Sequence, residues 1–334
     1  MDLFSNMREI FGRIVVPQLY ASGSCGFTRA LLTLRDNGGG VMIIPPGDYL
    51  DTLDLSMVQY EERISIFGFG RATRLMPLSG PAIATADNGH LSVSNLFCDG
   101  SLQNGGAAPG VLIRGAARGD FSFLDISGFP GDAIFCDGDL STEIRFERIY
   151  AENCGGWLFN YIRDENTQDT GGVYLDRFHG MGGPRQGVGG IRIVGQGSGS
   201  RAPVFGQVNG VTIDGINGPG ILLNGVASFQ AIGGWVSVRN IGGGAVHLED
   251  SVQTQWSHMQ IGNGSDSLVN GGPRDFNIKG SCNVTMIGDI EFRCHPIGHC
   301  IYFEDFGPIN TKVGSNIRTN GAALSNHPEM LTVD

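Results

Sequence analysis

The sequence predicts an all-β solenoid in which short strands stack into parallel sheets. A six-residue pattern returns between residues 64 and 281: apolar, any, apolar, two turn-like residues, apolar. Its clearest copies begin at Ile64, Leu91, Phe121, Ile144, Val173, Val211 and Val236, with fainter ones at Trp256 and Phe276. Glycine supplies 54 of the 334 residues, roughly twice its usual share. Repeats this short cannot bury an apolar face alone, so they must stack on one another.

Each repeat reads as two strands joined by a bend. The first and third positions lie on one face of a strand, which makes them the candidate core. The fifth position holds, in order, Gly68, Asn95, Asp125, Arg148, Arg177, Gly215, Asn240 and Gly280. Glycine and asparagine accept a left-handed backbone more readily than other residues do, so a bend is predicted there. A third strand follows, often led by glycine as in 156–159 and 220–223, which gives three strands per coil.

The N-terminal part of the chain reads differently from the repeats. Residues 27–36 have helical spacing, and their apolar side is formed by Phe27, Ala30, Leu31 and Leu34. This helix is predicted to cap the first coil, whose strand groups would otherwise be unpaired. We therefore predict an N-terminal arm at 1–26, the solenoid at 27–310 and a C-terminal tail at 311–334.

The composition argues against several classes of partner. The formal net charge is −11, from 22 basic and 33 acidic side chains, which disfavours nucleic acid and anionic membranes as partners. No run of about 18 apolar residues is present, so no membrane insertion is expected. The N-terminus lacks a basic start followed by an apolar core, so we expect no signal peptide and folding in a reducing cytoplasm.

The seven cysteines do not form a recognisable framework. Their number is odd and no CxxC pair occurs, which argues against a full disulfide set and against a zinc ribbon. Several lie within apolar runs, where a cysteine acts as a small hydrophobic residue. A dense cluster is formed by Cys294, His295, His299 and Cys300, but its spacing fits no familiar metal site. We expect no metal and no other cofactor.

Two parts of the sequence resemble a known superfamily. Residues 38–49 and 64–75 resemble the N-terminal cap and first coils of the pectate-lyase-like superfamily of right-handed parallel β-helices. Residues 211–225 and 236–250 resemble its generic coil. The resemblance covers roughly residues 27–305. It implies a right-handed, single-stranded parallel β-helix with an N-terminal capping helix.

Within that superfamily the chain is most similar in character to phage tailspike and tail-fibre proteins, because its N-terminal arm is short and no signal peptide is evident. The resemblance implies a homotrimer in the virion that contacts other virion proteins and binds, and often cleaves, host surface polysaccharide. Two departures are a lack of a separate trimerisation domain after residue 310 and of a large attachment domain before residue 26. They leave open a compact fibre, spike or capsid-decorating subunit.

Acidic side chains recur at the fourth position of the repeat. The candidate catalytic residues are Glu147, Asp176, Asp214 and, one coil further, Arg239. If these positions are in register, neighbouring carboxylates would lie about 5 Å apart and the outer pair about 10 Å apart. Retaining and inverting glycosidases use carboxyl separations of roughly 5–5.5 Å and roughly 6.5–9.5 Å. Arg148 and Arg177 adjoin the first two acids, so a neutralised stripe of surface charge is the alternative interpretation.

Inserted segments at 160–172 and 179–210 are expected to form loops on one face of the solenoid, where ligands usually bind. The candidate binding residues are Arg163, Asp164, Glu165, Arg185, Arg192 and Trp256. Acids and arginines suit a glycan that is anionic or rich in hydroxyl groups, and they suit plain solvation equally well. Trp157 and Trp235 adjoin inward strands and are predicted to lie in the core, whereas His247 is expected to be an outward surface histidine.

Apolar residues of the later coils, namely Val226, Phe229 and Ile232, are expected to face outward, where a threefold interface would bury them. The predicted function is that of a trimeric tailspike or tail-fibre-type protein that recognises host surface polysaccharide, with or without cleaving it. Two alternatives stay open: a non-enzymatic structural or decoration protein of the virion, and a cellular polysaccharide lyase or hydrolase.

Overall fold

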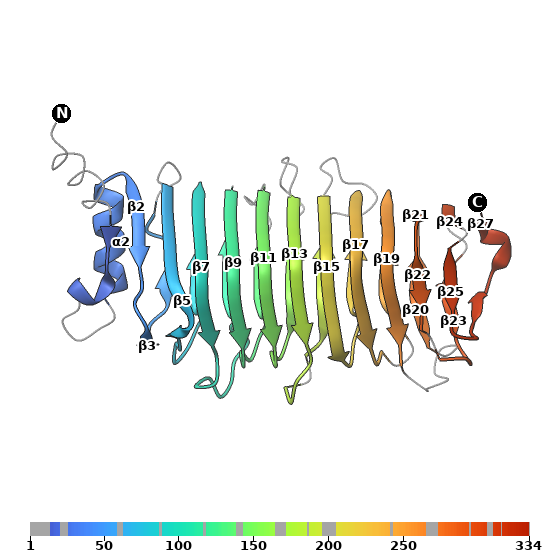
Figure 1. Ribbon diagram of the computed structural model, residues 1–334, viewed down its shortest axis with the longest axis horizontal. Helices are drawn as coiled ribbons and strands as arrows, with labels where there is room; N and C mark the ends of the chain where they lie inside the picture. The colour runs from blue at the N-terminus through green and yellow to red at the C-terminus, as the bar shows by residue number, and fades with distance from the viewer. Residues whose placement is uncertain are drawn as a thin grey trace.

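The protein is a right-handed parallel β-helix, which confirms the predicted fold class. The computed structural model describes residues 14–20, 26–58, 63–86, 89–115, 118–137, 143–163, 172–185, 187–195, 205–240, 243–264, 273–293, 295–305, 310–314 and 316–333. In Figure 1 the solenoid lies horizontally, with its N-terminal coils at the left and the long strands of one sheet toward the viewer. Successive coils pair in parallel, so each sheet runs along the whole solenoid.

Two sheets enclose the core. Sheet A consists of β1 (Ile14–Val15), β2 (Gly39–Ile43), β3 (Gly47–Tyr49), β5 (Arg63–Leu75), β7 (His90–Asp99), β9 (Arg118–Ser127), β11 (Glu143–Glu152), β13 (Gly172–Met181), β15 (Phe205–Ile216), β17 (Ser228–Val238), β19 (Thr254–Asn263), β21 (Asn283–Met286), β22 (Ile290–Phe292), β24 (Asn310–Val313), β25 (Ile317–Thr319) and β27 (Leu331–Val333). Sheet B consists of β4 (Leu53–Asp54), β6 (Ile83–Thr85), β8 (Val111–Arg114), β10 (Ile134–Asp137), β12 (Trp157–Ile162), β14 (Gly189–Val194), β16 (Ile221–Asn224), β18 (Gly244–Glu249), β20 (Arg274–Lys279), β23 (His299–Phe303) and β26 (Ala323–Ser325). Short 3-10 helices lie at Pro17–Tyr20 and Pro328–Met330.

The helix α2 (Phe27–Asp36) coincides with the predicted capping helix. It buries the four residues that the helical spacing selected, Phe27, Ala30, Leu31 and Leu34. Figure 1 shows it at the N-terminal end of the solenoid, where it packs against β2. None of the helices in the described part of the chain is long and apolar enough to cross a membrane.

Strands extend beyond the boundaries that we predicted for the solenoid. β1 belongs to the predicted arm at 1–26 and pairs with β2, although much of that arm lies outside the described residues. At the other end, β25, β26 and β27 add strands to both sheets. The predicted tail at 311–334 is therefore largely part of the solenoid, because its apolar residues Ile317, Leu324 and Leu331 pack against the core.

The long strands of sheet A bend at residues with a left-handed backbone. This bend column consists of Asn95, Phe123, Arg148, Arg177, Gly210, Gly233 and His258, whose φ angles lie between 54° and 65°. The predicted positive φ is confirmed at Asn95, Arg148, Arg177, Gly215 and Gly280. It is wrong at Gly68, Asp125 and Asn240. In β9 the bend lies at Phe123 instead, because Phe121 and Leu124 on either side of it both point into the core.

Aromatic rings stack along the core from coil to coil. The ring centroids of Phe121 and Phe146 lie 5.2 Å apart. The ring of Trp256 lies between those of Phe229 and Phe276, at centroid distances of 5.2 and 4.9 Å. Trp256 is fully buried, because strand alternation places it in an inward row of β19. The prediction that it contacts a glycan is therefore wrong.

Three further side-chain predictions are wrong. Trp157 is buried as predicted, but Trp235 is 40% exposed, because it follows the bend of β17 at an outward position. Val226 and Phe229 are fully buried rather than outward. Among the three apolar residues predicted to face outward, Ile232 alone is exposed.

The described cysteines are free and buried; they are Cys98, Cys136, Cys154, Cys282 and Cys300. Burial raises the pKa of Cys282 to about 11 and the pKa of Cys154 to about 12. These thiols therefore stay protonated at neutral pH and act as small core residues. Cys25 and Cys294 lie outside the described residues, so the predicted Cys/His cluster is only partly described.

Replacing the bend glycine Gly210 by alanine should lower the free energy of unfolding by about 1 kcal/mol. The cause is backbone strain, because φ is +61° at this residue and an added Cβ would meet only an ordinary contact with Arg177. Gly105→Ala is the matched control, since an added Cβ there meets nothing within 4 Å and φ is not positive. Denaturant unfolding of both variants checks the prediction, and equal stability would contradict it.

Candidate functional site

The predicted acid ladder contains two carboxylates rather than three. Glu147 on β11 pairs directly with Asp176 on β13, as predicted. The next residue in that row is Asn209, whereas Asp214 lies further along β15, opposite Met181. The true equivalent of the repeat in β15 begins at a glycine, Gly206, where an added Cβ would lie 2.6 Å from the ring of Phe229. The apolar pattern at 211–216 therefore belongs mainly to the half of the strand after the bend.

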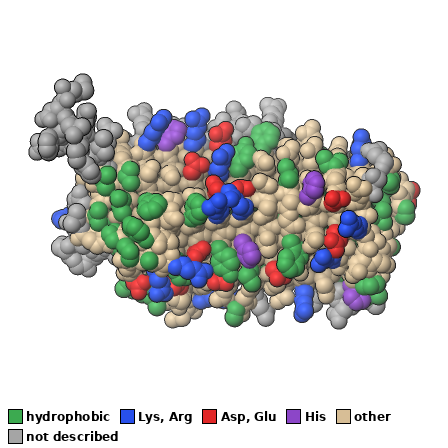
Figure 2. Space-filling model, viewed as in Figure 1, with side chains coloured by type: hydrophobic (Ala, Val, Ile, Leu, Met, Phe, Trp, Pro, Cys, Tyr) green, Lys and Arg blue, Asp and Glu red, His purple; other side chains and the backbone are tan. Residues whose placement is uncertain are grey.

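Ion pairs neutralise the two carboxylates of this row. Arg177 Nη2 lies 2.5 Å from Glu147 Oε1 and 2.9 Å from Asp176 Oδ2. Asn209 Nδ2 donates to Asp176 Oδ1 at 2.9 Å, and Arg148 Nε lies 3.7 Å from Glu147 Oε1. Figure 2 shows this face of sheet A, where basic and acidic side chains gather near its middle. The geometry matches the alternative interpretation of a neutralised charge stripe, and a catalytic role for Glu147 and Asp176 stays a prediction.

Asp214 and Arg239 lie together in a separate surface cavity of about 440 Å³. Its other lining residues include Gly215, Asn217 and Ser237. The four predicted catalytic residues are thus divided between two places on the solenoid. A single acid beside an arginine does not provide the two carboxylates of a glycosidase.

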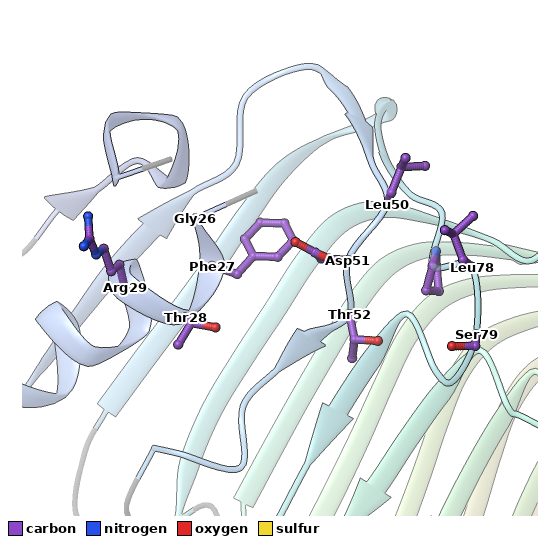
Figure 3. Close-up of a pocket in the computed structure, with 10 residues that line it drawn as sticks. Gly26, Phe27, Thr28, Arg29, Leu50, Asp51, Thr52, Leu78 and Ser79 are labelled. Carbon is purple, nitrogen blue, oxygen red and sulfur yellow. The ribbon is translucent and has the colours of Figure 1, made fainter. Parts of the chain in front are cut away.

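A larger cavity of about 650 Å³ lies beside the capping helix. Figure 3 shows that the first turn of α2 faces two turns of the first coils, and the lining residues are Gly26, Phe27, Thr28, Arg29, Leu50, Asp51, Thr52, Pro77, Leu78 and Ser79. Leu50 and Leu78 are exposed. Arg29 and Asp51 are the charged residues in this lining. The cavity too contributes one carboxylate, so it does not form a two-acid site.

Sheet B carries a row of mainly polar side chains in register, in which Asn160 and Asn277 are buried and the other polar members reach the surface. One residue from each of seven consecutive strands forms what we call the sheet B strip: Phe135, Asn160, Arg192, Leu222, His247, Asn277 and Tyr302. A second row beside it contains Asn224, Glu249 and Lys279. Strands of a sheet lie about 4.8 Å apart, so the strip is about 29 Å long.

A half-buried carboxyl group adjoins the strip at β12. Asp132, in the turn before β10, accepts hydrogen bonds from the Trp157 backbone N–H at 2.6 Å and from Asn160 Nδ2 at 2.8 Å. Burial raises the pKa of Asp132 above its ordinary value, although these two hydrogen bonds and the charge of Arg192 oppose that shift. A carboxyl that holds its proton to a higher pH than usual is suited to act as a general acid.

The surroundings of Asp132 include a partly exposed arginine and a buried amide. The Arg192 guanidinium lies 5.9 Å from the ring centroid of Trp157. Asn160 is only 5% exposed, and its Oδ1 has no hydrogen-bond partner among the described residues. A buried acceptor without a partner costs free energy, so an enclosed water is the expected donor to this atom, which is closed to the surface.

The predicted binding residues are only partly brought together. Arg163 directly follows β12 and is buried, and its backbone N–H donates to Val194 O at the end of β14, the strand that carries Arg192. Arg185 lies elsewhere, on a turn between the sheets, where its Nη2 donates to the backbone oxygen of Gln103 at 3.0 Å. Asp164 and Glu165 lie outside the described residues.

Sequence reasoning missed Asp132 and Asn160. Asp132 lies in a turn, where the apolar repeat gives no register for side chains. Asn160 opens the predicted inserted loop at 160–172, yet it belongs to β12. A signal was present in the run 157–162, which is as long as a strand and carries an amide at an outward alternating position.

Comparisons with known proteins reveal the fold but no sequence relative. No protein-family model matches the chain, and no curated protein sequence matches it. Tailspike protein 2 from Escherichia coli O157:H7 bacteriophage CAB120 aligns with 92% of this chain at a TM-score of 0.62 and 11% identity. The aligned part is 46% of the tailspike, so this chain spans less than half of that protein's length.

Two further solved structures share the fold over nearly their whole length. DFA-IIIase from Arthrobacter chlorophenolicus A6, in complex with GF2, has a TM-score of 0.60 and 12% identity, covering 97% of this chain and 92% of that one. The A-module of a mannuronan C-5 epimerase from Azotobacter vinelandii has a TM-score of 0.54 and 10% identity, covering 93% and 98%. At these identities the likeness establishes the parallel β-helix and nothing beyond it.

The variant Asp132→Asn should flatten the dependence of stability on pH. A carboxyl whose pKa is raised in the folded state binds its proton more tightly there, so its contribution is most favourable below the unfolded value of about 3.9 and is lost as the pH rises through the folded pKa. An asparagine at this position does not ionise, so the loss of stability with rising pH disappears. Its amide nitrogen is a new donor, and the Asn160 side chain can rotate so that its Oδ1 accepts that hydrogen bond. Unfolding at a series of pH values and NMR titration of the carboxyl check this, and a midpoint at or below about 3.9 would contradict it.

Proposed function

We propose that this chain is the β-helical subunit of a tailspike or tail-fibre-type virion protein that binds host surface polysaccharide along the sheet B strip. One observation carries the proposal: hydrogen-bonding side chains recur in register on five of seven consecutive strands of sheet B, and Arg192, His247 and Tyr302 among them reach the surface. A polysaccharide is itself a linear repeat of hydroxyl groups. A solenoid offers such a ligand donors and acceptors at a constant spacing of about 4.8 Å.

The chemistry of the strip supports a saccharide ligand. Amides, carboxylates and arginine provide the directional hydrogen bonds that distinguish one sugar from another. Apolar groups lie between them, with the partly exposed Leu222 in the row itself and Trp157 beneath Arg192. Alternation of polar and apolar contacts is typical of small-ligand sites, where a few placed polar groups fix the orientation.

A homotrimer is part of the proposal, with the outer face of sheet A toward the other subunits. Exposed apolar side chains on that face are Phe67, Phe69, Phe123, Ile232 and Trp235, and Figure 2 shows hydrophobic side chains across it. Apolar surface of this kind is often buried between subunits. Packing through sheet A would leave sheet B free for a glycan. The fold shared with a phage tailspike supports the virion role.

Cleavage of the polysaccharide is a separate part of the proposal. Asp132 is the residue best placed to supply a proton, and like Asp214 it is a single acid that does not make a two-carboxylate glycosidase site. The acid ladder of sheet A is less suited to this role, because Arg177 already pairs with both of its carboxylates. The same ion pairs favour the alternative of a non-enzymatic structural or decoration protein of the virion.

A panel of purified capsular and O-antigen polysaccharides tests the binding proposal. We expect saturable binding of at least one polysaccharide, and Arg192→Ala should weaken it about tenfold, a typical loss for an arginine at a binding centre. Arg35→Ala is the matched control, because Arg35 lies in the last turn of α2, outside both sheets, with its side chain 35% exposed. Isothermal titration calorimetry gives both affinities. An equal loss in the two variants, or no binding to any member of the panel, would contradict the proposal.

Chain-length analysis by size exclusion separates the candidate acids. If a bound polysaccharide is shortened, Asp132→Asn should abolish the shortening, while Asp176→Asn and Asp214→Asn should retain it. Loss of cleavage in either of the latter variants would instead support the sequence prediction for the acid ladder. A bound polysaccharide of unchanged length would assign the chain to recognition alone.

A further inference from the structure

A polar network, buried at Arg274 and Asn277, includes the C-terminal members of the strip on β20 and β23. Arg274 is 2% exposed and Asn277 is fully buried. Arg274 Nη1 donates to Asn277 Oδ1 at 2.8 Å and to Glu304 Oε1 at 3.2 Å. The guanidinium carbon of Arg274 lies 3.6 Å from the ring centroid of Tyr302. These contacts hold the amide of Asn277 in one position.

The network also fixes which way the Asn277 amide faces. Arginine only donates, so the amide oxygen must face Arg274 and the amide nitrogen must face the other side. There Nδ2 donates to Glu304 Oε1 at 2.8 Å and lies 2.7 Å from His247 Nδ1. Both amide hydrogens are then used.

It follows that His247 accepts at Nδ1 and carries its single ring proton on Nε2. Among the described residues, Nε2 of His247 has no hydrogen-bond partner. It is also absent from the buried side-chain atoms without a partner, so this nitrogen is accessible from the surface. Burial lowers the pKa of His247 below its ordinary value; Glu304 and Glu249 act against that shift, and Lys279 and Arg274 reinforce it. His247 is therefore a neutral imidazole whose Nε2–H is open to the surface.

Charges around this imidazole are paired with one another. Arg274 pairs with Glu304 at 3.2 Å, and Lys279 Nζ pairs with Glu249 Oε1 at 2.6 Å. The nearest strip neighbour on β16 is the apolar Leu222. A ligand here meets no net charge, one outward donor and an apolar side chain.

We propose that His247 forms a binding subsite in which its Nε2–H donates to an oxygen of an uncharged sugar unit lying over Leu222. Asn277 is the positioning residue, because it fixes the ring proton on Nε2. This inference rests on the proposed function, since it assigns one subsite of the same polysaccharide-binding strip and limits the sugar there to one without a carboxylate.

NMR of the imidazole nitrogens tests the positioning network without any ligand. In the full-length protein, Nδ1 of His247 should stay unprotonated from about pH 8 down to well below the ordinary histidine pKa of about 6.5. Asn277→Asp should raise the pKa of His247, because a carboxylate then faces Nδ1. A proton on Nδ1 in the unaltered protein at neutral pH would overturn the proposal, whether or not the Asn277 variant folds.

Binding by histidine variants tests the subsite, with a panel of neutral and uronate-containing capsular polysaccharides as the probes. His247→Leu should weaken binding of a neutral polysaccharide about tenfold, and His247→Gln, which keeps an amide donor, should retain most of it. His295→Leu, in the turn between β22 and β23, is the matched control and should bind as the unaltered protein does.

The outcomes distinguish this subsite from the proposed function. If the unaltered protein binds and His247→Leu binds equally well, the subsite is refuted while the polysaccharide-binding role stands. Binding restricted to polysaccharides composed entirely of uronate units refutes the uncharged sugar unit. If the unaltered protein binds no polysaccharide of the panel, the proposed function and the subsite both fail.

Discussion

Parallel pairing between successive coils is the constraint on which the rest of this protein depends. One residue pairs with one residue of the next strand, so the register decides which row every side chain occupies. Neighbours within a row lie about 4.8 Å apart, which stacks Phe121 on Phe146 inside the solenoid. The same rule places Asn160 beside Arg192 on the outside. A slip of one residue would exchange the buried and exposed faces of a strand, so core and surface are fixed together.

The bend column links this register to the surface charges of sheet A. Arg148 and Arg177 both hold φ angles of 54°, a conformation that costs a residue with a Cβ about 1 kcal/mol. Arg148 lies 4.8 Å from the ring centroid of Phe123 in the preceding coil, and Arg177 reaches two carboxylates. These contacts offset part of the strain. The acidic row therefore supports the bend, as expected for a neutralised stripe of surface charge.

The sequence was sufficient for the fold because the repeat, the glycine turns and the capping helix all reflect backbone requirements. It was insufficient for the site because register cannot be read where a strand contains two apolar patterns. Val211 to Ile216 matches the repeat as well as Val173 to Phe178 does, yet the structure pairs Leu175 with Val208. Asp214 therefore does not lie in the row of Glu147 and Asp176, where it was predicted. The prediction for Trp256 was wrong for a related reason: in a weak repeat, the sequence pattern fits an aromatic residue in the core as well as one on the surface.

The polar residues of sheet B are the places where this sequence departs from what stacking alone requires. Phe135 and Leu222 show that apolar side chains satisfy the same outward row. Burying Arg274 and Asn277 there carries a desolvation cost, and a well-packed apolar replacement of a buried ion pair is often neutral or stabilising. Stability therefore does not explain the network. Sites that break local rules in this way are commonly functional, and the Nε2–H of His247 is a donor that the described part of this network leaves open to the surface.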